Sequence, residues 1–287
     1  MRGGKGSAAQ GPPPRPLGLD GRLSFFMLHA LAPRVPRVAP APPPSSFEPF
    51  ERFDVPHALR AEPLLATWFP AAGAARGAVL LAHPWLSVGQ GYFHRYRRIP
   101  ALREAGFHVL TFDMPGFGGS GRLRGYGDED VEQMLDALAR RAPGLPWHFW
   151  GVSSGGVWGS ILLARREAFA GAMFEDVTPH LLEWSWRAVP AQRPAYLLYR
   201  TFLRRGYAFL DLRRHVPFLN ARAVAHVAGG RDLGIPEAET RELAALARSE
   251  LLLVAPAAHL ESIRLAHDEV IALALRTFET AGGRGVR

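Results

Sequence analysis

From residue 50 onward, short runs of consecutive apolar residues alternate with segments whose apolar positions recur at helical spacing. Runs of about six apolar residues are typical of strands that are buried on both faces of a sheet. Strands are predicted at 50–55, 64–69, 77–82, 107–112, 147–150, 171–177, 223–228 and 250–255, and the run at 77–82 is of this continuously apolar kind. The helices predicted between and after them lie near 93–104, 128–138, 157–162, 236–248 and 260–280. The helix near 128 has an apolar stripe at i, i+3, i+4 and i+7, with Asp128 expected as its N-cap.

This alternation predicts an α/β protein built on one mostly parallel sheet of eight strands, with helices on both faces. The first two strands, 50–55 and 64–69, are expected to form an antiparallel pair. In such sheets, functional sites form beyond the carboxyl ends of the parallel strands. The residues that directly follow each strand are therefore the first candidates for chemistry.

The chain divides into an N-terminal extension, 1–46, and one domain, 47–287. The extension is rich in Pro, Gly and Arg and lacks a periodic apolar pattern, so we expect it to be disordered and to pack against nothing. Its one apolar island, 25–31, is far too short to span a bilayer, and no transmembrane segment is predicted. Met27 lies in that island, and the sequence leaves open whether translation begins at Met1 or Met27.

The net charge of +8 is concentrated in the extension, where six basic residues and one acidic residue account for +5. The domain shows no basic stripe with interleaved aromatic residues, so we expect no nucleic-acid partner. The absence of cysteine excludes disulfides and thiolate ligands. The histidines show no metal-binding spacing, so we expect neither a metal nor a cofactor. A cytoplasmic location is the working expectation.

A Gly-x-Ser-x-Gly pattern follows the predicted strand near 147. In a strand–turn–helix context, this pattern is typical of a nucleophile elbow, where small flanking residues let strand and helix approach closely. Ser153 fits the pattern because Gly151 and Gly155 occupy the two small positions. Choosing Ser154 would place the branched Val152 where glycine is needed, so Ser153 is the predicted nucleophile.

Two further polar residues follow later strands at the same expected edge of the sheet. Asp232 lies four residues beyond strand 223–228, and His259 lies four residues beyond strand 250–255. A serine hydroxyl needs an imidazole to accept its proton, and the imidazole needs a carboxylate to orient it. Ser153, His259 and Asp232 can supply these three roles.

Five motifs in this order resemble those of the α/β-hydrolase superfamily over about residues 50–278, most closely its serine esterase, lysophospholipase and serine aminopeptidase branch. The motifs are HPW at 83–85, DMPGFGGSG at 113–121, GVSSGG at 151–156, GGRD at 229–232 and His259. The resemblance implies the eight-stranded α/β-hydrolase sheet. It also implies a helical lid formed by the aromatic-rich insertion 179–220.

The same resemblance implies an oxyanion hole made of two backbone N–H groups. One belongs to Ser154, directly after the nucleophile, and the other comes from the turn after strand 77–82. Because Pro84 has no N–H, Trp85 is the expected donor there. Asp176, at the end of strand 171–177, is the alternative triad acid, and Asp113 is expected to shape its loop.

The function expected from these residues is that of a serine hydrolase that cleaves a carboxylic ester through an acyl-enzyme. A serine nucleophile argues against epoxide hydrolase chemistry, which uses a carboxylate at this position of the fold. The same triad also serves thioesters, peptides and some C–C bonds, and a non-catalytic binding protein is a further alternative. The expected partner is a small molecule with an apolar acyl or alcohol group, bound by aromatic residues of the insertion, namely Trp184, Trp186, Tyr196 and Tyr199. The oligomeric state is left open.

Overall fold

One eight-stranded sheet forms the centre of the computed structural model, which describes residues 11–15, 23, 38–39, 42–58, 61–121, 127–166 and 169–282. The strands are β1 (Glu51–Val55), β2 (Leu64–Phe69), β3 (Gly77–Ala82), β4 (Phe107–Phe112), β5 (Trp147–Val152), β6 (Phe169–Glu175), β7 (Ala221–Gly229) and β8 (Glu250–Val254). Their order across the sheet is β1-β2-β4-β3-β5-β6-β7-β8. Strand β2 is antiparallel to both β1 and β4, and every other pair is parallel. The predicted mostly parallel sheet with an antiparallel opening pair is therefore confirmed.

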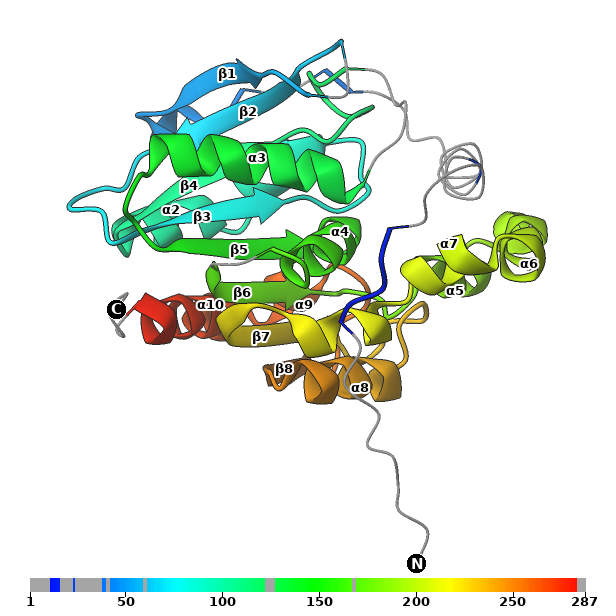
Figure 1. The fold of residues 1–287 in the computed structure, drawn as a ribbon. Helices are drawn as coiled ribbons and strands as arrows, with labels where there is room; N and C mark the ends of the chain where they lie inside the picture. Colours follow the sequence, from blue (N-terminus) through cyan, green and yellow to red (C-terminus); the bar gives the residue numbers. More distant parts are fainter. Residues whose placement is uncertain are drawn as a thin grey trace, which may run out of the picture.

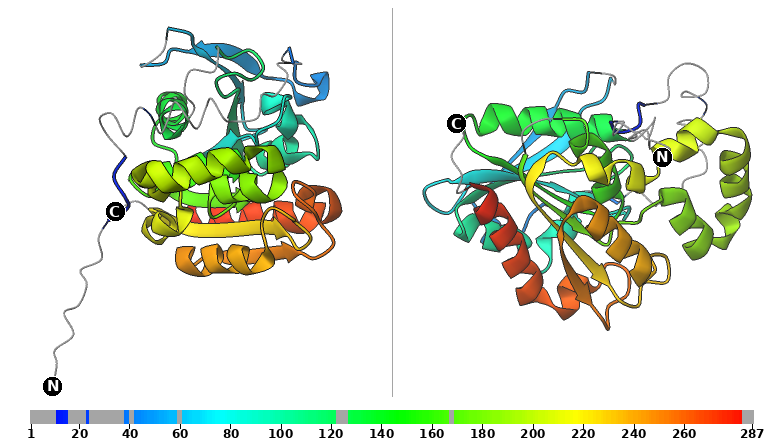
Figure 2. Two further views of the ribbon diagram at one scale, coloured as in Figure 1. Left: turned by 90° about the vertical axis from the view of Figure 1, so that its right-hand side faces the viewer. Right: turned by 60° about the horizontal axis from the view of Figure 1, so that its bottom comes forward.

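Helices cover both faces of this sheet (Figures 1 and 2). They are α2 (Arg98–Glu104), α3 (Asp128–Arg141), α4 (Ser154–Leu163), α5 (Leu181–Ala188), α6 (Arg193–Phe202), α7 (Arg204–Phe209), α8 (Glu237–Ala247), α9 (Ser262–Leu265) and α10 (His267–Gly282). One apolar core contains side chains of α3, α4 and α8, and the other contains side chains of α2, α9 and α10. All six residues of β3 are buried, as its continuous apolar run predicts.

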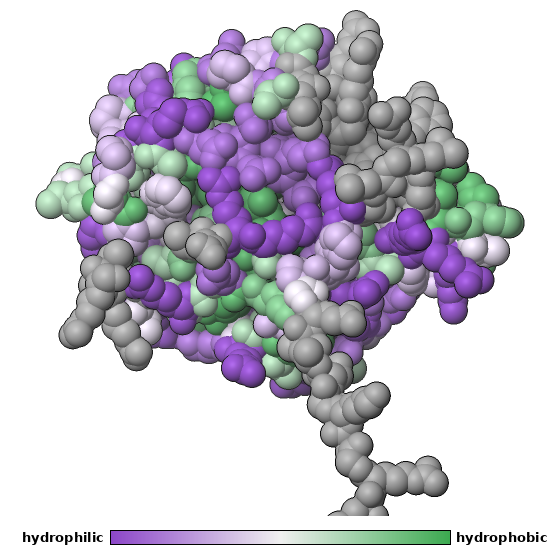
Figure 3. Space-filling model, in the orientation of Figure 1, coloured by the Kyte–Doolittle hydropathy of each residue, from purple (hydrophilic) through white to green (hydrophobic). Residues whose placement is uncertain are grey.

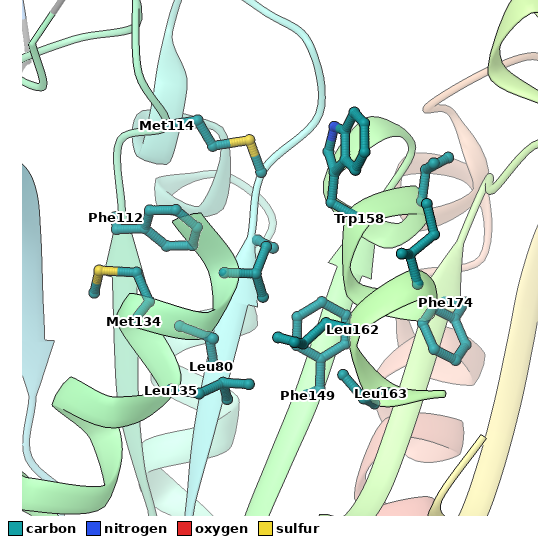
Figure 4. Close-up of a cluster of buried hydrophobic side chains, with 14 of the residues drawn as sticks. Leu80, Phe112, Met114, Met134, Leu135, Phe149, Trp158, Leu162, Leu163 and Phe174 are labelled. Atoms are coloured by element: carbon teal, nitrogen blue, oxygen red, sulfur yellow. The ribbon is translucent and has the colours of Figure 1, made fainter. Parts of the chain in front are cut away.

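The core on the α3 and α4 side is closely packed around the strand that leads to Ser153. Figure 4 shows Met134 and Leu135 of α3 beside Leu80 of β3, and Leu162 of α4 beside Phe149 of β5. All five of these side chains are at most 5% exposed. Burial of this kind contributes about 25 cal/mol per Å² of apolar surface, which holds α4 firmly against the sheet.

Three predicted helices differ from the structure at their ends or in their continuity. The segment near 93–104 is the 3₁₀ helix η2 (Gly89–His94) followed by α2, because Tyr96 and Arg97 adopt positive φ between them. The closing helix is divided into α9 and α10. Asp128 is the first residue of α3 and Gly127 is the N-cap, so the predicted N-cap was wrong by one residue. The carboxylate of Asp130 accepts a hydrogen bond from the backbone N–H of Gly127 (2.8 Å).

The insertion 179–220 forms α5, α6 and α7, which lie together beyond the edge toward which β3 and β5 point (Figure 1). Tyr199 and Phe209 are each 2% exposed and join the core of the body, so these aromatic side chains fasten the insertion to the domain. The visible surface of the insertion is partly apolar (Figure 3). Leu197 and Phe202 of α6 are 51% and 74% exposed.

Part of the N-terminal extension lies in the described residues. Within 11–15, Pro13 is buried and its carbonyl accepts a hydrogen bond from Arg165 (3.2 Å), while Arg15 forms an ion pair with Asp128 (3.5 Å). The expectation that the extension packs against nothing is thus wrong for this short stretch, because polar groups of α3 and the end of α4 hold it. Residues 1–10, 16–22, 24–37 and 40–41, which include the island 25–31, fall outside the described residues, so the predicted disorder of the extension remains untested there. No helix among the described residues is long and apolar enough to cross a membrane.

The apolar core on the α2 side contains a fully buried ion pair. Arg98 of α2 donates from Nη2 to Oε1 of Glu175 at the end of β6 (2.6 Å), and both side chains have no exposure. The other oxygen of Glu175 accepts from Nε1 of Trp150 (3.1 Å), and the guanidinium lies over the rings of Trp150 and Tyr92. Because two charges are taken out of water here, each one depends on the other for its stability.

Replacing Arg98 by Met should therefore destabilise the protein by roughly 3–5 kcal/mol, since Glu175 would remain buried without its counter-charge. The measurement is urea unfolding of wild type and variant. The matched control is Arg97→Met at the preceding residue, whose pair with Glu104 (3.0 Å) is exposed on both sides. That control should lose less than about 1 kcal/mol. Equal losses would contradict the importance of the buried pair.

Candidate active site

Ser153 occupies a sharp turn between β5 and α4. Strand β5 ends at Val152 and the helix begins at Ser154, so the serine alone makes the change of direction. Its backbone has φ 48° and ψ −118°, a conformation that costs a non-glycine residue about 1–3 kcal/mol. The surroundings hold it there. The N–H of Ser153 donates to the carbonyl of Glu175 on β6 (2.8 Å), and its own carbonyl accepts from the N–H of Val157 (3.0 Å).

The glycines around Ser153 are required by close contacts. A Cβ added to Gly151 would lie 2.6 Å from the Cα of Gly156, and one added to Gly155 would lie 2.3 Å from the carbonyl oxygen of Ala82. No side chain fits at either position without movement of the backbone. The structure therefore gives a steric reason for the choice of Ser153 over Ser154, because the two small positions flank Ser153.

His259 and Asp232 lie beside Ser153, although 106 and 79 residues separate them from it in the sequence. The Oγ of Ser153 is 3.0 Å from Nε2 of His259, and Nδ1 of His259 is 2.6 Å from Oδ2 of Asp232. A carboxylate only accepts hydrogen bonds, so in the neutral imidazole Nδ1 carries the proton and Nε2 is an acceptor for the serine hydroxyl. The three residues thus form one continuous hydrogen-bonded chain.

The loop after β7 holds Asp232 in place. Its Oδ1 accepts from the backbone N–H groups of Gly234 (2.8 Å) and Ile235 (3.1 Å), which leaves Oδ2 for the histidine. The side chain of Asp232 is only 2% exposed, against 23% for His259. The carboxylate is therefore fixed in orientation, while the imidazole remains accessible from one side.

Charge around the imidazole raises the pKa of His259 above its ordinary value. Burial lowers this pKa, but the hydrogen bond to Asp232 and the negative charges of Asp176, Asp232 and Glu175 outweigh burial. The site therefore stabilises the protonated imidazole, which is the form that exists after the histidine has accepted a proton.

The carboxylate of Asp176, the alternative acid, accepts hydrogen bonds from donors other than the imidazole of His259. Its Oδ1 accepts from the N–H of Gly229 (3.1 Å) and the hydroxyl of Ser262 (3.3 Å), and its Oδ2 accepts from the N–H of Leu260 (2.8 Å). Burial and the neighbouring charge of Glu175 raise the pKa of Asp176 to about 7. The geometry thus favours Asp232 as the partner of the histidine.

The turn after β3 lies against the start of α4, because the Cβ position of Gly155 is within 2.7 Å of the carbonyl oxygens of both Ala82 and His83. His83 is fully buried, and its ring stabilises this turn. Its Nε2 accepts from the N–H of Met114 (3.0 Å) and its Nδ1 lies 2.7 Å from the carbonyl of Pro84. Trp85 follows directly, with its ring edge-on to Phe117. The turn and the N-terminus of α4 with Ser154 are therefore neighbours.

Of the four aromatic residues expected to line a pocket, Trp184 lies nearest to the site. Its ring centroid is 5.6 Å from that of His259, and its indole lies beside Gly234 in the loop of Asp232. The other three are packed among themselves or into the body. The ring of Trp186 is tilted by 47° against that of Tyr196, with the centroids 4.9 Å apart, and Tyr196 and Tyr199 are 8% and 2% exposed.

Sequence reasoning did not find the contacts that organise the loops around the site. Asp113, expected to shape its loop, accepts from the N–H groups of Gln90 (2.8 Å) and Gly119 (3.0 Å). The link to Gln90 has no sequence signal, and neither has the pairing of Arg98 with Glu175. Among the described residues, no three His, Asp or Glu side chains converge as a metal site would require.

A family model described as "alpha/beta hydrolase fold" matches residues 77–197. Among curated proteins, epoxide hydrolase A of Mycobacterium tuberculosis is 32% identical over 109 residues, which is 35% of this chain and 32% of that protein. The alignment thus spans about a third of the length of this relative.

Solved structures are similar over most of the chain. An esterase of Pyrococcus furiosus has a TM-score of 0.69 at 17% identity, covering 87% of this chain and 98% of that chain. The acylaminoacyl peptidase of Pyrococcus horikoshii has a TM-score of 0.64 at 12% identity, covering 80% of this chain and 41% of that chain. At these identities the likeness concerns the fold.

We expect the imidazole of His259 to titrate above the ordinary histidine value of about 6.5. NMR titration of the histidine resonances measures this pKa, and the signal that disappears in His259→Gln identifies the residue. Asp232→Asn should lower the pKa, because it removes the hydrogen bond and a negative charge that favour the protonated ring. An ordinary or lowered pKa in the wild-type protein would contradict this account.

Proposed function

We propose that this chain, which belongs to the α/β-hydrolase superfamily, is a serine hydrolase that cleaves a carboxylic ester through an acyl-enzyme. The observation that carries the proposal is the hydrogen-bonded chain from Ser153 through His259 to Asp232. Its members come from three segments far apart in the sequence and meet beyond the carboxyl ends of β5, β7 and β8.

In the proposed reaction, Nε2 of His259 accepts the hydroxyl proton of Ser153 as Oγ attacks the ester carbonyl carbon. The tetrahedral intermediate then collapses, the bond to the alcohol oxygen breaks, and His259 returns the proton to that leaving oxygen. A water molecule next gives one proton to His259 and attacks the acyl carbon. The bond from that carbon to Oγ then breaks, His259 returns the proton to Oγ, and the acid is released. Asp232 keeps the imidazole oriented and stabilises its cationic form throughout.

The oxyanion of each tetrahedral intermediate is proposed to bind the backbone N–H groups of Ser154 and Trp85. Ser154 is the first residue of α4, where the helix dipole favours negative charge. Support for Trp85 comes from the close approach of its turn to α4 and from Pro84, which has no N–H to donate. Each such donor contributes about 3–4 kcal/mol to stabilisation of the transition state.

The proposed substrate carries an apolar acyl or alcohol group that lies against Trp184. The indole of Trp184 is half-buried beside His259 and offers a flat apolar face. Its Nε1 is buried against Gly234, so the apolar face of the ring, and not its N–H group, is proposed to contact the substrate. The insertion that carries Trp184 then acts as a lid over the acyl-enzyme.

Other chemistry remains compatible with the same residues. One structural relative is an acylaminoacyl peptidase, and Ser153 with His259 could equally attack an amide or thioester carbonyl. Epoxide opening of the kind suggested by the name of the curated relative is disfavoured, because Ser153 stands where that chemistry uses a carboxylate. A panel of ester, thioester, peptide and epoxide substrates separates these possibilities.

Ser153→Ala should abolish covalent labelling by a fluorophosphonate probe and reduce ester turnover to background, because it removes the attacking oxygen. The adjacent Ser154→Ala is the matched control. It should retain most of the activity, since the proposed role of Ser154 uses its backbone N–H. Labelling is read by mass spectrometry and folding by circular dichroism. Labelling that persists in Ser153→Ala, or an inactive Ser154→Ala, would disprove the assignment of the nucleophile.

Trp184→Ala should penalise esters with long or aromatic groups more than acetate esters, by about 10- to 200-fold in relative kcat/KM. The physical reason is the loss of apolar contact that only the larger group makes. Trp186→Ala is the control on the same helix, since the ring of Trp186 contacts Tyr196 instead. A uniform loss on all esters in Trp184→Ala would show that this residue has only a structural role.

A further inference from the structure

A buried carboxylate next to the site takes no part in the proposed chemistry. Asp176 follows β6 directly, is completely buried, and accepts three hydrogen bonds. Taking a carboxylate out of water is costly unless its oxygens are well paired. Both oxygens of Asp176 accept hydrogen bonds, whereas asparagine would offer one acceptor oxygen and a donor NH2 group, so the carboxylate is explained by what it holds on each side.

The three donors belong to the two loops that carry the partners of Ser153. Gly229 ends β7 and lies three residues before Asp232, and its N–H donates to Oδ1 of Asp176 (3.1 Å). Leu260 directly follows His259, and its N–H donates to Oδ2 (2.8 Å). The third donor is the hydroxyl of Ser262 (3.3 Å), and Ser262 is the first residue of α9, which follows the loop of His259. One carboxylate therefore joins both loops to the end of β6.

Backbone strain at two of these residues shows that the connection is under constraint. Leu260 has φ 64° and Asp176 has φ 51°, and neither residue is glycine. Such conformations cost about 1–3 kcal/mol each and persist only where surrounding contacts hold them. The hydrogen bond from Leu260 N–H to Asp176 is such a contact. It fixes the turn immediately after His259 and thereby the direction in which the imidazole leaves the backbone.

We propose that Asp176 is a positioning residue that sets the geometry of the Ser153–His259–Asp232 chain by anchoring both partner loops with one carboxylate. The expected change in kcat rests on the function proposed above, whereas the expected change in the pKa of His259 does not. Misplacement of a reacting group by about 1 Å can cost 100-fold in rate, so this anchoring acts on turnover without contact with the substrate.

Asp176 also influences His259 electrostatically. The charged groups near the imidazole are Asp232 in the loop after β7, Glu175 and Asp176 at the end of β6, and Arg98 of α2, which neutralises Glu175. The lid contributes the uncharged ring of Trp184. Because Asp176 is one of the charges that raise the pKa of His259, its removal should lower that pKa.

The test compares Asp176→Asn with Asp130→Asn. Asp130 is an equally buried aspartate that contacts His57 and Gly127 at the start of α3, away from the two loops. In Asp176→Asn, kcat for a simple ester should fall about 10- to 100-fold with KM nearly unchanged. The NMR titration of His259 should move to lower pH. In Asp130→Asn, the pKa of His259 should stay at its wild-type value and only the melting temperature should fall.

Asp232→Asn provides the upper reference, since loss of the orienting acid should reduce kcat about 10⁴-fold. A loss of that size in Asp176→Asn would overturn the proposal by making Asp176 the acid itself. Wild-type kcat together with an unchanged pKa of His259 would overturn it as well. If Asp176→Asn does not fold, Ser262→Ala decides, because it removes one donor and keeps the charge. Its kcat should fall several-fold, and full activity would count against the proposal.

These outcomes can be separated from failure of the proposed function. If the wild-type protein neither reacts with the fluorophosphonate probe nor hydrolyses esters, the hydrolase proposal fails. The pKa of His259 in Asp176→Asn still reports whether Asp176 controls the imidazole, because the NMR titration requires no substrate.

Discussion

The close approach of α4 to the ends of β3 and β5 is the constraint on which the rest of the site depends. Backbone atoms come so near at Gly151 and Gly155 that no Cβ can be placed there, and Ser153 between them is held in a strained conformation. The cost of this turn is offset by the apolar core beneath α4, where Trp158, Ile161 and Leu163 have no exposure. Close packing therefore positions the serine hydroxyl, and the hydroxyl itself contributes little to the fold.

A second constraint is the concentration of negative charge on one side of the imidazole. Glu175, Asp176 and Asp232 surround His259, and only Glu175 has a buried cation, Arg98, as its partner. The other two carboxylates are stabilised chiefly by backbone N–H groups of the loops that they organise. The same hydrogen bonds thus shape the loops and keep charge near the histidine. This arrangement favours a protonated imidazole at the centre of the site.

The insertion 179–220 is joined to the body by side chains with different roles. Arg187 of α5 forms a two-point pair with Glu239 of α8 and also donates to the carbonyl of Gly234, close to Asp232. Tyr199 and Phe209 enter the core. These contacts couple the insertion to the loop of Asp232, so a movement of the insertion would also displace the loop that carries Asp232. Leu197 and Phe202 of α6 remain largely exposed.

The sequence by itself determined the strands, their mostly parallel order and the residues that follow them. Continuous apolar runs such as 77–82 leave little alternative to a buried strand. Ser153, Asp232 and His259 each lie in the turn or loop that follows a predicted strand. Local signals failed where contacts across the chain decide the backbone. The break at Tyr96 and Arg97 and the division between α9 and α10 are examples. Local propensity is weak there, and packing overrides it.

Only the tertiary structure decided which acid meets the histidine and what the other one does. Asp176 and Asp232 both follow parallel strands, so their positions in the sequence favour neither by geometry. The choice depends on distances of a few ångströms between residues that are 27 or more positions apart in the sequence, and no local pattern encodes these distances. The hydrogen bonds from Gly229 and Leu260 to Asp176 could not be predicted from the sequence for the same reason. A backbone N–H has no side-chain identity, so its partner emerges only once the chain has folded.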